Sequence, residues 1–557
     1  MLPGKRWNIL NTDTNKSVID TILENRNLSA DHLEPFRLTQ RLHSPYLLPD
    51  MEKAVKRILA AIENNEKIFI FGDYDADGIT SAAVLLFFFR KIDFPVNCIL
   101  PHREKDGYGL RIESVDKIAE LGGQLLITVD NGISSNDAAE HAAKIGLDLV
   151  ITDHHLQEGD LPEACAIVNP NRKDSKYPFK TICGAAVAFK VVFALAEKLL
   201  EKEDFKQFIL NSLDLVTIGT IADVMPIRDE NYALVKFGLK VLSATRKPGL
   251  AALKRVSGVK ERSVTPVSVG FFLAPRLNAA GRLGSAEDAL KLLTADSIEE
   301  ANHMAAYLDK LNRDRQKMQT DYLNDALRTL DADEDKMNKV IFVENENWHP
   351  GLTGLVSGQL KELYYRPALA FAVDSDNNYV GSARSIDSFH ITKALTKFSD
   401  YFVTYGGHRK AAGLTVHKEH FSRFKQEFTA YADEQISADE LVPELTVDSI
   451  VDIEQANLST AKIIQEIGPF GEMNPEPVFV LQNAQIHDMF TMTNGRHLKF
   501  TVQRGNQTFE CVWWRGGENK DSLWFGQTVD IAFRFGINSW QGKERLQLVV
   551  EDASIVS

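Results

Sequence analysis

Three short apolar runs in the first third of the chain each end at an acidic residue, and this recurrence limits the folds that the chain can adopt. The runs are IFIF at 68–71, QLLITV at 124–129 and DLVIT at 148–152. Their length and composition are typical of buried strands, and segments with helical patterns at 111–121 and 135–145 separate them. Strand–helix–strand units of this kind build a parallel sheet, and right-handed crossovers bring all three acidic ends to one edge of it.

The first of these ends carries three carboxylates within five residues, in GDYDADG: Asp73, Asp75 and Asp77. Carboxylates so close together repel one another, so at neutral pH they need a cation or an unusual protonation state. Ligands of open α/β sheets bind at the carboxyl ends of the strands, which favours a divalent-metal site. For this stretch alone, a solvated acidic turn is the alternative. A calcium loop is excluded because its obligatory Glu position holds Val84.

Further candidate ligands follow the other runs. Asp130 follows the second run in VDNG, and His154 and His155 follow the third in TDHH. Asp223 ends an apolar, helix-like run just before Pro226. Taken singly, Asp130 could be a helix N-cap, and His155 could be a surface histidine without a role. Four acidic segment ends in one chain nevertheless favour a metal site. Oxygen ligands with an imidazole and no thiolate suit Mn²⁺ or Mg²⁺, and their number suits two ions arranged for in-line phosphoryl transfer.

The segments GDYDADG, VDNG, TDHH and IADV, in this order, resemble the four signature segments of the DHH phosphoesterase superfamily. The resemblance implies that Asp130 bridges two metal ions and that His155 contacts the scissile phosphate. Asp75 and Asp130 would bind the first ion. Asp73 is expected to complete that site, because Phe71 stands where some branches have a histidine. The ligands of the second ion would be Asp77, Asp130, His154 and Asp223.

Basic residues gather further along the chain in PRLNAAGR at 275–282. Arginine forks suit phosphate oxygens, so we expect Arg276 and Asn278 to contact a substrate phosphate. A structural salt bridge is an equally common use of arginine. From 285 to 349 there is no Gly or Pro, and apolar residues recur at helical spacing, which predicts a long connecting helix over 286–335.

A second α/β unit is predicted from 336 to 435, and it contains the Gly-rich segment YGGHRKAAGLTV. Alone, such a loop is more often a tight structural turn, although its backbone N–H groups could approach a phosphate. Within the resemblance, the GGH segment marks the DHH-associated domain. The resemblance then implies that this domain brings Ser382, Arg384 and His408 towards the 5′ phosphate of a substrate, which they would hold together with Arg276. Gly407 is also expected to contact a substrate phosphate.

Short β-rich runs alternate in the C-terminal segment, 441–557, and predict a small OB-like barrel. Exposed aromatic side chains on such a barrel are stacking platforms for single-stranded bases, which suggests single-stranded DNA binding by Trp513, Trp514 and Trp540. Against this, residues 478–557 have no basic excess, and half of the tryptophans here are expected to belong to the core.

Composition limits the class of protein. The chain has 557 residues and a net charge of −14, which argues against a polybasic nucleic-acid binder without excluding a local basic channel. Four scattered cysteines without a CxxC pair fit buried thiols in a reducing cytosol. No uninterrupted apolar run approaches ~18 residues, so we expect a cytoplasmic protein that does not contact membranes.

The expected fold is α/β, with a parallel-sheet DHH domain at 51–285, a connecting helix, a DHH-associated α/β domain and a C-terminal OB-like barrel. Residues 1–50 are expected to pack on the catalytic domain. This domain order looks like that of a bacterial 5′→3′ exonuclease that degrades single-stranded DNA to 5′-mononucleotides in DNA repair and recombination. The implied partners are single-stranded DNA and possible helicase and single-strand-binding proteins, with the enzyme a monomer.

Two rival functions remain open at this point. One is a DHH phosphatase acting on short oligonucleotides, cyclic dinucleotides or pyrophosphate, for which an extended strand-binding barrel would be unnecessary. The other is a catalytically dead DHH homologue that serves as a binding module. Degenerate acids would be expected in such a module, whereas every acid and histidine of the signature segments is present here.

Overall fold

The computed structural model describes residues 4–29, 34–103, 106–107, 109–259, 263–332 and 338–556. The chain divides into two compact units. The parallel-sheet unit comprises Pro35–Arg315 and Pro469–Pro475. The barrel unit comprises the remainder, Met1–Glu34, Gln316–Gly468 and Glu476–Ser557.

The parallel-sheet unit is built on five parallel strands in the order β3-β2-β4-β5-β6. Alternate residues of each strand enter different cores: Ile68 and Ile70 pack with one cluster, and Phe69 and Phe71 with another. Both faces are therefore covered, which is why these strands are continuously apolar rather than alternating. The strands are β2 Ile68–Phe71, β3 Val96–Ile99, β4 Leu125–Val129, β5 Asp148–Thr152 and β6 Ala166–Val168.

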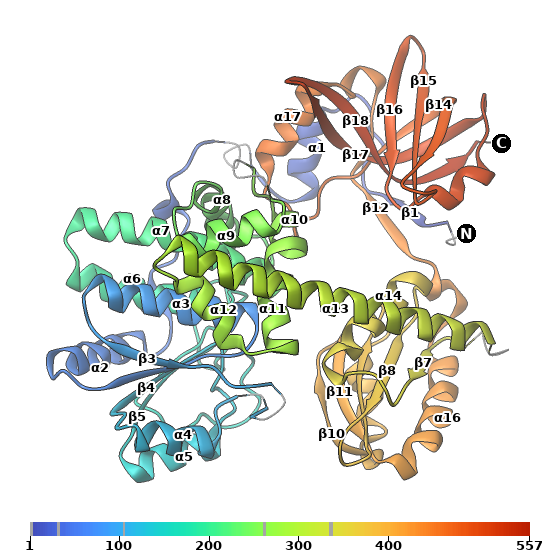
Figure 1. The fold of residues 1–557 in the computed structure, drawn as a ribbon. Helices are drawn as coiled ribbons and strands as arrows, with labels where there is room; N and C mark the ends of the chain where they lie inside the picture. Colours follow the sequence, from blue (N-terminus) through green and yellow to red (C-terminus); the bar gives the residue numbers. More distant parts are fainter. Residues whose placement is uncertain are drawn as a thin grey trace. The chain divides into compact units, whose positions relative to one another are not determined.

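Helices cover the two faces of this sheet (Figure 1). On one face lie α4 and α5, and on the other lie α2, α3 and α6. The helices of this unit are η2 Leu38–Gln40, η3 Pro45–Leu47, α2 Met51–Glu63, α3 Ala76–Lys91, α4 Ile112–Glu120, α5 Asn136–Ile145, α6 Gly184–Leu199, α7 Lys202–Ala222, α8 Asp229–Ser243, α9 Pro248–Val256, α10 Pro266–Ser268, η4 Val269–Leu273, α11 Ala274–Leu283 and α12 Ala286–Thr294.

The sheet order brings the predicted acidic ends together. Strand β4 pairs with β2 on one side and with β5 on the other, so the three loops that leave their carboxyl ends are neighbours. The helical run before Asp223 is also confirmed, because α7 ends at Ala222 and Asp223 is its C-cap.

The single helix expected over 286–335 is corrected by the structure. This stretch of the chain forms two helices, α12 and the 35-residue α13 Ile298–Ala332. Helix α12 ends at Thr294, and Ala295 after it has extended backbone angles. The buried side chains of α12 join the main core of the parallel-sheet unit. Residues 333–337, the end of the expected helix, lie outside the described residues.

The barrel unit contains the predicted second α/β fold, a five-stranded sheet in the order β10-β11-β9-β8-β7. Only β7 and β8 run parallel, and the other pairs are antiparallel. Its elements are β7 Ile341–Glu344, η5 Pro350–Leu352, α14 Thr353–Tyr364, β8 Ala368–Val373, β9 Tyr379–Arg384, α15 Ile391–Thr396, η6 Ser399–Tyr401, β10 Phe402–Gly407, β11 Ala411–Val416 and α16 Lys418–Gln435.

The C-terminal segment forms the predicted small barrel, which closes where β14 pairs with β17 as well as with β15. Long strands with alternating burial build it, as in β15, where every second side chain is buried. Its elements are η7 Ala438–Leu441, β12 Glu444–Val447, β13 Ser449–Ile450, η8 Ile453–Gln455, α17 Leu458–Ile467, β14 Phe479–Met492, β15 His497–Arg504, β16 Gln507–Trp513, η9 Gly517–Ser522, β17 Thr528–Trp540 and β18 Lys543–Ile555.

Residues 1–50, which we expected to pack on the catalytic domain, are divided between the two units. Strand β1 Arg6–Ile9 pairs in parallel with β12, and the Trp7 indole donates to the carboxylate of Asp552. Helix α1 Val18–Asn25 also lies in the barrel unit. From Pro35 onward the segment does belong to the parallel-sheet unit, where Leu38 and Leu48 are core residues.

Two expectations from composition can be compared with the structure. Cys183 and Cys511 are buried, but Cys165 is exposed and Cys98 is half-buried, so the expectation of four buried thiols is wrong. Within the described residues, no helix combines the length and the apolarity needed to cross a bilayer.

Candidate metal centre

The loop between β2 and α3 positions the first group of carboxylates. Asp75 is the N-cap of α3, and its Oδ1 accepts hydrogen bonds from the backbone N–H groups of Asp77 and Gly78 at 2.9 and 3.1 Å. The chain must pass close to itself here, because a Cβ at Gly78 would lie 2.6 Å from the backbone of Asp73. The glycine therefore permits the tight loop that gathers the three acids.

Asp77 is held by the N-terminus of α6. Its two carboxylate oxygens accept hydrogen bonds from the backbone N–H groups of Gly184 and Ala185, at 2.6 and 2.9 Å. The positive end of the helix dipole stabilises a negative charge in this position. A Cβ on Gly184 would lie 2.6 Å from the Asp130 side chain, so the absence of a side chain there lets α6 approach both acids.

Asp130 and Asp223 each carry a buried carboxylate oxygen without a well-aligned hydrogen-bond donor among the described residues. Asp130 has a left-handed backbone (φ 61°), and so has Val224 (φ 54°), the residue after Asp223. Such a conformation is a real strain for a β-branched residue, and strain of this kind clusters at functional sites. Among the described residues, none donates a hydrogen bond to the buried Oδ1 of Asp130 or Oδ2 of Asp223. A buried carboxylate oxygen without a donor is costly unless a cation binds it.

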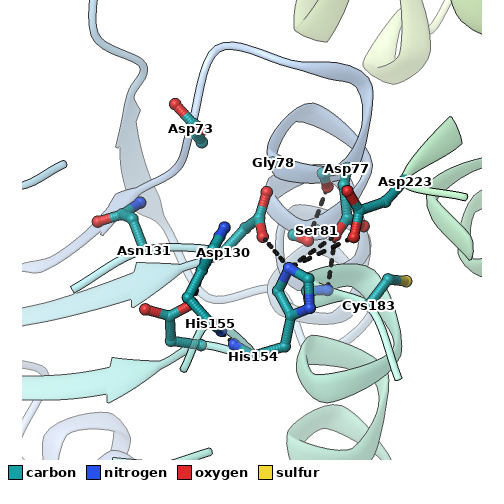
Figure 2. A network of polar contacts seen from close by, with 12 residues as sticks. Asp73, Asp77, Gly78, Ser81, Asp130, Asn131, His154, His155, Cys183 and Asp223 are labelled. Atoms are coloured by element: carbon teal, nitrogen blue, oxygen red, sulfur yellow. Dashed lines mark hydrogen bonds and ion pairs between the residues drawn. The ribbon is translucent and has the colours of Figure 1, made fainter. Parts of the chain in front are cut away.

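The imidazole of His154 lies at the centre of these acids (Figure 2). Its Nε2 is 3.1 Å from Asp130, 3.5 Å from Asp223 and 3.8 Å from Asp77. Burial lowers the pKa of His154, which favours the neutral imidazole that binds metals. Candidate ligand atoms form three groups, and within each group they lie within 4.8 Å of one another: Asp77, His154 and Asp223; Asp73, Asp75 and Asp130; and Asp130, His154 and His155.

Electrostatics make this cluster unfavourable without a cation. Burial and the charge of Asp75 raise the pKa of Asp73 to about 8. Burial and the charges of Asp77 and Asp75 raise the pKa of Asp223 to about 8, and burial followed by the Asp77 charge raises that of Asp130 well above its usual range. Hard divalent cations would remove this repulsion, so the residues present fit Mn²⁺ or Mg²⁺.

Asp153 is a functional residue that the sequence analysis missed. Its Oδ1 accepts a hydrogen bond from Nδ1 of His155 at 2.7 Å, and its Oδ2 accepts one from the backbone N–H of Ile133 at 2.9 Å. Although burial lowers the pKa of His155, the bond to Asp153 raises it to about 9. The Asp153 carboxylate therefore holds the His155 ring through Nδ1 and favours its protonated form. The only signal in the sequence was its place in the TDHH segment.

Arg276 and Asn278 both lie on α11, which packs on the metal-binding loop. The Asn278 Oδ1 accepts a hydrogen bond from the backbone N–H of Ala76 at 2.8 Å, next to the Asp75 cap. A Cβ at Gly281 would lie 2.3 Å from the backbone oxygen of Tyr74, so α11 approaches this loop closely. Arg276 forms an ion pair with Asp309 at 2.8 Å, which is the salt bridge that the sequence analysis left open.

Four further predicted residues lie in the mixed sheet of the barrel unit. Ser382 and Arg384 are on β9 beside the N-terminus of α14, where a Cβ on Gly354 would lie 3.0 Å from the Arg384 guanidinium. A hydroxyl, a guanidinium and a helix N-terminus together suit a phosphate. Gly407 and His408 follow on β10 and its turn, with β11 between β9 and β10. Gly407 has φ 148°, and the His408 N–H donates to Ala411 at 2.7 Å.

The barrel tryptophans differ in exposure. Trp514 is 55% exposed, with the edge of its ring on His497 at 5.0 Å. Trp513 is half-buried and packs over Gly516, where a Cβ would lie 2.4 Å from its ring. The side chain of Trp540 lies outside the described part of the structure. Three exposed aromatic side chains were not predicted: Phe490, Trp524 and Phe525.

Comparison with protein families matches three successive regions of the chain. Residues 67–220 match the DHH family, N-terminal domain, and residues 337–434 match the DHHA1 domain. Residues 447–552 match the RecJ OB domain. The strands of the parallel sheet and the candidate metal ligands other than Asp223 therefore fall within the DHH region.

Solved structures with this arrangement contain the expected metals. A Thermus thermophilus RecJ in complex with Mn²⁺ superposes with a TM-score of 0.81 at 28% identity, covering 99% of this chain and 80% of that one. The same protein in complex with Mg²⁺ gives 0.78 at 27% identity, covering 99% of this chain and 79% of that one. An exonuclease RecJ bound to manganese is 32% identical, with a TM-score of 0.61 over 73% of this chain and all of that one.

Curated relatives share about a third of their residues with this chain. The single-stranded-DNA-specific exonuclease RecJ of Bacillus subtilis is 35% identical over 92% of this chain, which spans 64% of that relative's length. The proteins of the same name from Salmonella typhimurium and Escherichia coli are each 33% identical over 91% of this chain and 90% of their own length. On this similarity and on the three matched regions, the chain belongs to the RecJ family.

Proposed function

We propose that this protein is a metal-dependent exonuclease that hydrolyses single-stranded DNA from the 5′ end to 5′-mononucleotides. The observation that carries the proposal is the convergence of five carboxylates and His154 at one sheet edge, with buried oxygens that lack donors. The names of the relatives supply the substrate class, since they are single-stranded-DNA-specific exonucleases.

The residues present assign two metal sites. Asp73, Asp75 and Asp130 would hold one ion, and Asp77, Asp130, His154 and Asp223 the other, with Asp130 shared. When bound, Mn²⁺ or Mg²⁺ supplies Lewis-acid activation of water and of the phosphodiester. The N-terminus of α6 holds Asp77 in place for this role, as the Asp75 cap does for the β2–α3 loop.

His155 would act on the scissile phosphate directly. Its Nδ1 donates to Asp153, which fixes the ring, and its Nε2 would donate to a non-bridging phosphate oxygen. A positioned cationic donor stabilises the negative charge that develops on the phosphoryl group during in-line displacement.

Substrate binding is assigned to groups in both units of the chain. Arg276 and Asn278 would contact phosphate on the parallel-sheet unit. Ser382, Arg384, Gly407 and His408 would bind the terminal 5′ phosphate on the mixed sheet, where the Ser382 hydroxyl also bonds Thr353 at 3.1 Å. Trp514, with Trp513 and Trp540, would stack single-stranded bases on the barrel. Contacts of these kinds read no base edges, so sequence preference should be slight.

The domain assignment follows the same reasoning. We assign catalysis to residues 51–285 and binding of the single strand to 441–557. Residues 336–435 would close over the substrate, and the helix before them connects the two α/β domains. The proposal places the enzyme in the cytoplasm as a monomer in DNA repair and recombination, supplied with single strands by a helicase and a single-strand-binding protein.

One assay tests the proposed activity. A 5′-phosphorylated single-stranded oligonucleotide, labelled at the 3′ end in one sample and internally in another, is incubated with the protein and Mn²⁺. The proposal predicts mononucleotide products released from the 5′ end, no cleavage of a blunt duplex, and loss of activity on chelation. Release from the 3′ end, or cleavage of dinucleotides with long strands left intact, would refute it and favour the small-substrate phosphatase.

A further inference from the structure

The Arg276 guanidinium is held by a carboxylate from another helix. Its Nε donates to Oδ1 of Asp309 at 3.0 Å, and its Nη2 lies 2.8 Å from the same oxygen. Its Nη1 donates to the backbone oxygen of Phe272 at 2.6 Å. Both side chains are largely buried, at 12% exposure for Arg276 and 14% for Asp309, so solvent weakens this pair little.

These contacts fix one edge of the guanidinium. A guanidinium has five N–H groups in a planar fork. The contacts to Asp309 and Phe272 use its Nε–H and one N–H on each terminal nitrogen. One N–H on each of Nη1 and Nη2 remains outside these contacts with described residues, and this pair forms the fork that binds two oxygens of one phosphate.

The local charge also suits an anion. Asp309 pairs through its Oδ2 with Nη2 of Arg313 at 2.8 Å, so one carboxylate lies between two guanidinium groups. This arrangement leaves one positive charge in excess. Arg276 stands two residues before Asn278 on α11, and the side-chain oxygen of Asn278 accepts a hydrogen bond from the backbone beside the metal-binding loop.

We propose that Asp309 of α13 is a positioning residue, which orients the Arg276 fork towards a phosphate of the substrate strand. The inference rests on the proposed function, in which Arg276 binds phosphate. It adds a residue outside α11 that determines how well this arginine binds. Because Asp309 pairs with Arg276 and Arg313 and belongs to none of the candidate metal-ligand groups in the described residues, its loss should weaken substrate binding more than it slows the chemical step.

The test compares kcat and KM of the full-length enzyme with Mn²⁺ on single strands that carry a 5′ phosphate or a 5′ hydroxyl. Asp309→Asn should raise KM about tenfold with kcat within about twofold, as expected when a charge-assisted contact is misaligned. Arg276→Ala should raise KM at least as much. Asp314→Asn, which changes an exposed acid on the same helix, should stay within about twofold of wild type.

The outcomes separate this inference from the proposed function. A wild-type protein without exonuclease activity would refute the function itself. If Arg276→Ala raises KM and Asp309→Asn does not, the positioning role of Asp309 is overturned while the function holds. Thermal unfolding monitors the fold of each variant. Should Asp309→Asn unfold, Asp309→Glu keeps the charge but displaces the carboxylate by one methylene: raised KM at an unchanged unfolding midpoint supports the inference, and wild-type KM refutes it.

Discussion

The imidazole of His155 is held by one buried carboxylate, that of Asp153, which also accepts a hydrogen bond from the Ile133 backbone. This carboxylate fixes the ring plane and determines which nitrogen carries the outward proton. Asp153 has no predicted role of its own in binding metal or substrate, because both of its oxygens accept hydrogen bonds inside the protein. It is therefore a residue whose effect on activity should pass through His155.

Asp153→Asn should lower kcat about 10- to 100-fold, the usual effect of removing a residue that orients a reacting side chain. The asparagine amide has the same size as the carboxylate, but it carries no negative charge to accept the hydrogen bond from the His155 Nδ1–H. Steady-state kinetics on 5′-phosphorylated single-stranded DNA measures this effect. Asp160→Asn, an exposed acid in the loop that follows, is the matched control and should be unchanged. A kcat within twofold of wild type for Asp153→Asn would show that His155 needs no orienting partner.

The convergence of the strand-end acids could be predicted from the sequence, because apolar runs of fixed length ending in acids map directly onto one edge of a parallel sheet. The hydrogen-bond partner of each side chain could not be predicted from the sequence. The Asn278 oxygen accepts from the backbone N–H of Ala76, 202 residues away in the sequence, and the Nε edge of the Arg276 guanidinium bonds Asp309. Such partners depend on how whole helices pack, which no local pattern encodes.

At the scale of elements, the N-terminus of α6 holds two of the acids, Asp77 and Asp130, in place. Its first residue, Gly184, donates to Asp77 and lies against Asp130. No glycine-specific backbone angle is needed there, so the requirement is for space alone.

Gly184→Ala should therefore displace Asp130 or α6 without unfolding the domain. A Cβ would lie 2.6 Å from the Asp130 side chain, and a displacement of about 1 Å at a reacting centre costs up to about 100-fold in rate. We expect at least a tenfold loss of kcat/KM at unchanged helical content by circular dichroism. Gly159→Ala, where no atom lies within 4 Å of the added Cβ, should behave as wild type. Full activity in Gly184→Ala would mean that the close approach has no functional role.

Periodic elements were predictable and their interruptions were not. The runs at 68–71, 124–129 and 148–152 became β2, β4 and β5 within one residue. The stretch from 286 to 335 reads as one helix because it lacks Gly and Pro, yet tertiary packing ends α12 at Thr294 and α13 starts at Ile298. Strand β1 was missed because four residues with alternating burial gain their stability only from pairing with β12.

At the scale of the whole molecule, the N-terminal and C-terminal segments form one structural region. Trp7 and Ile9 pack with Val447 and Val480 in a shared cluster, and the Trp7 indole bonds Asp552. A truncation that removes only 441–557 would expose this apolar surface of β1.

Removing 1–29 together with 441–557 is therefore the suitable deletion. If the barrel binds the strand, activity on long single-stranded DNA should fall at least about tenfold, since stacking contributes ~1–3 kcal/mol per base. Activity on dinucleotides should fall much less, because these substrates are too short to reach a stacking platform. Comparing kcat/KM on the two substrates measures the difference, and equal losses on both would remove the barrel from substrate binding.

The central claim is that the acids around His154 bind two divalent cations, and titration of the metal-free protein with Mn²⁺ by calorimetry tests it most directly. We predict two Mn²⁺ per chain for the wild type, and fewer for Asp130→Asn, because this substitution removes the negative charge of the residue that the proposal assigns to both sites. A wild-type protein that binds no Mn²⁺, or an Asp130→Asn variant that binds two as tightly as wild type, would contradict the account.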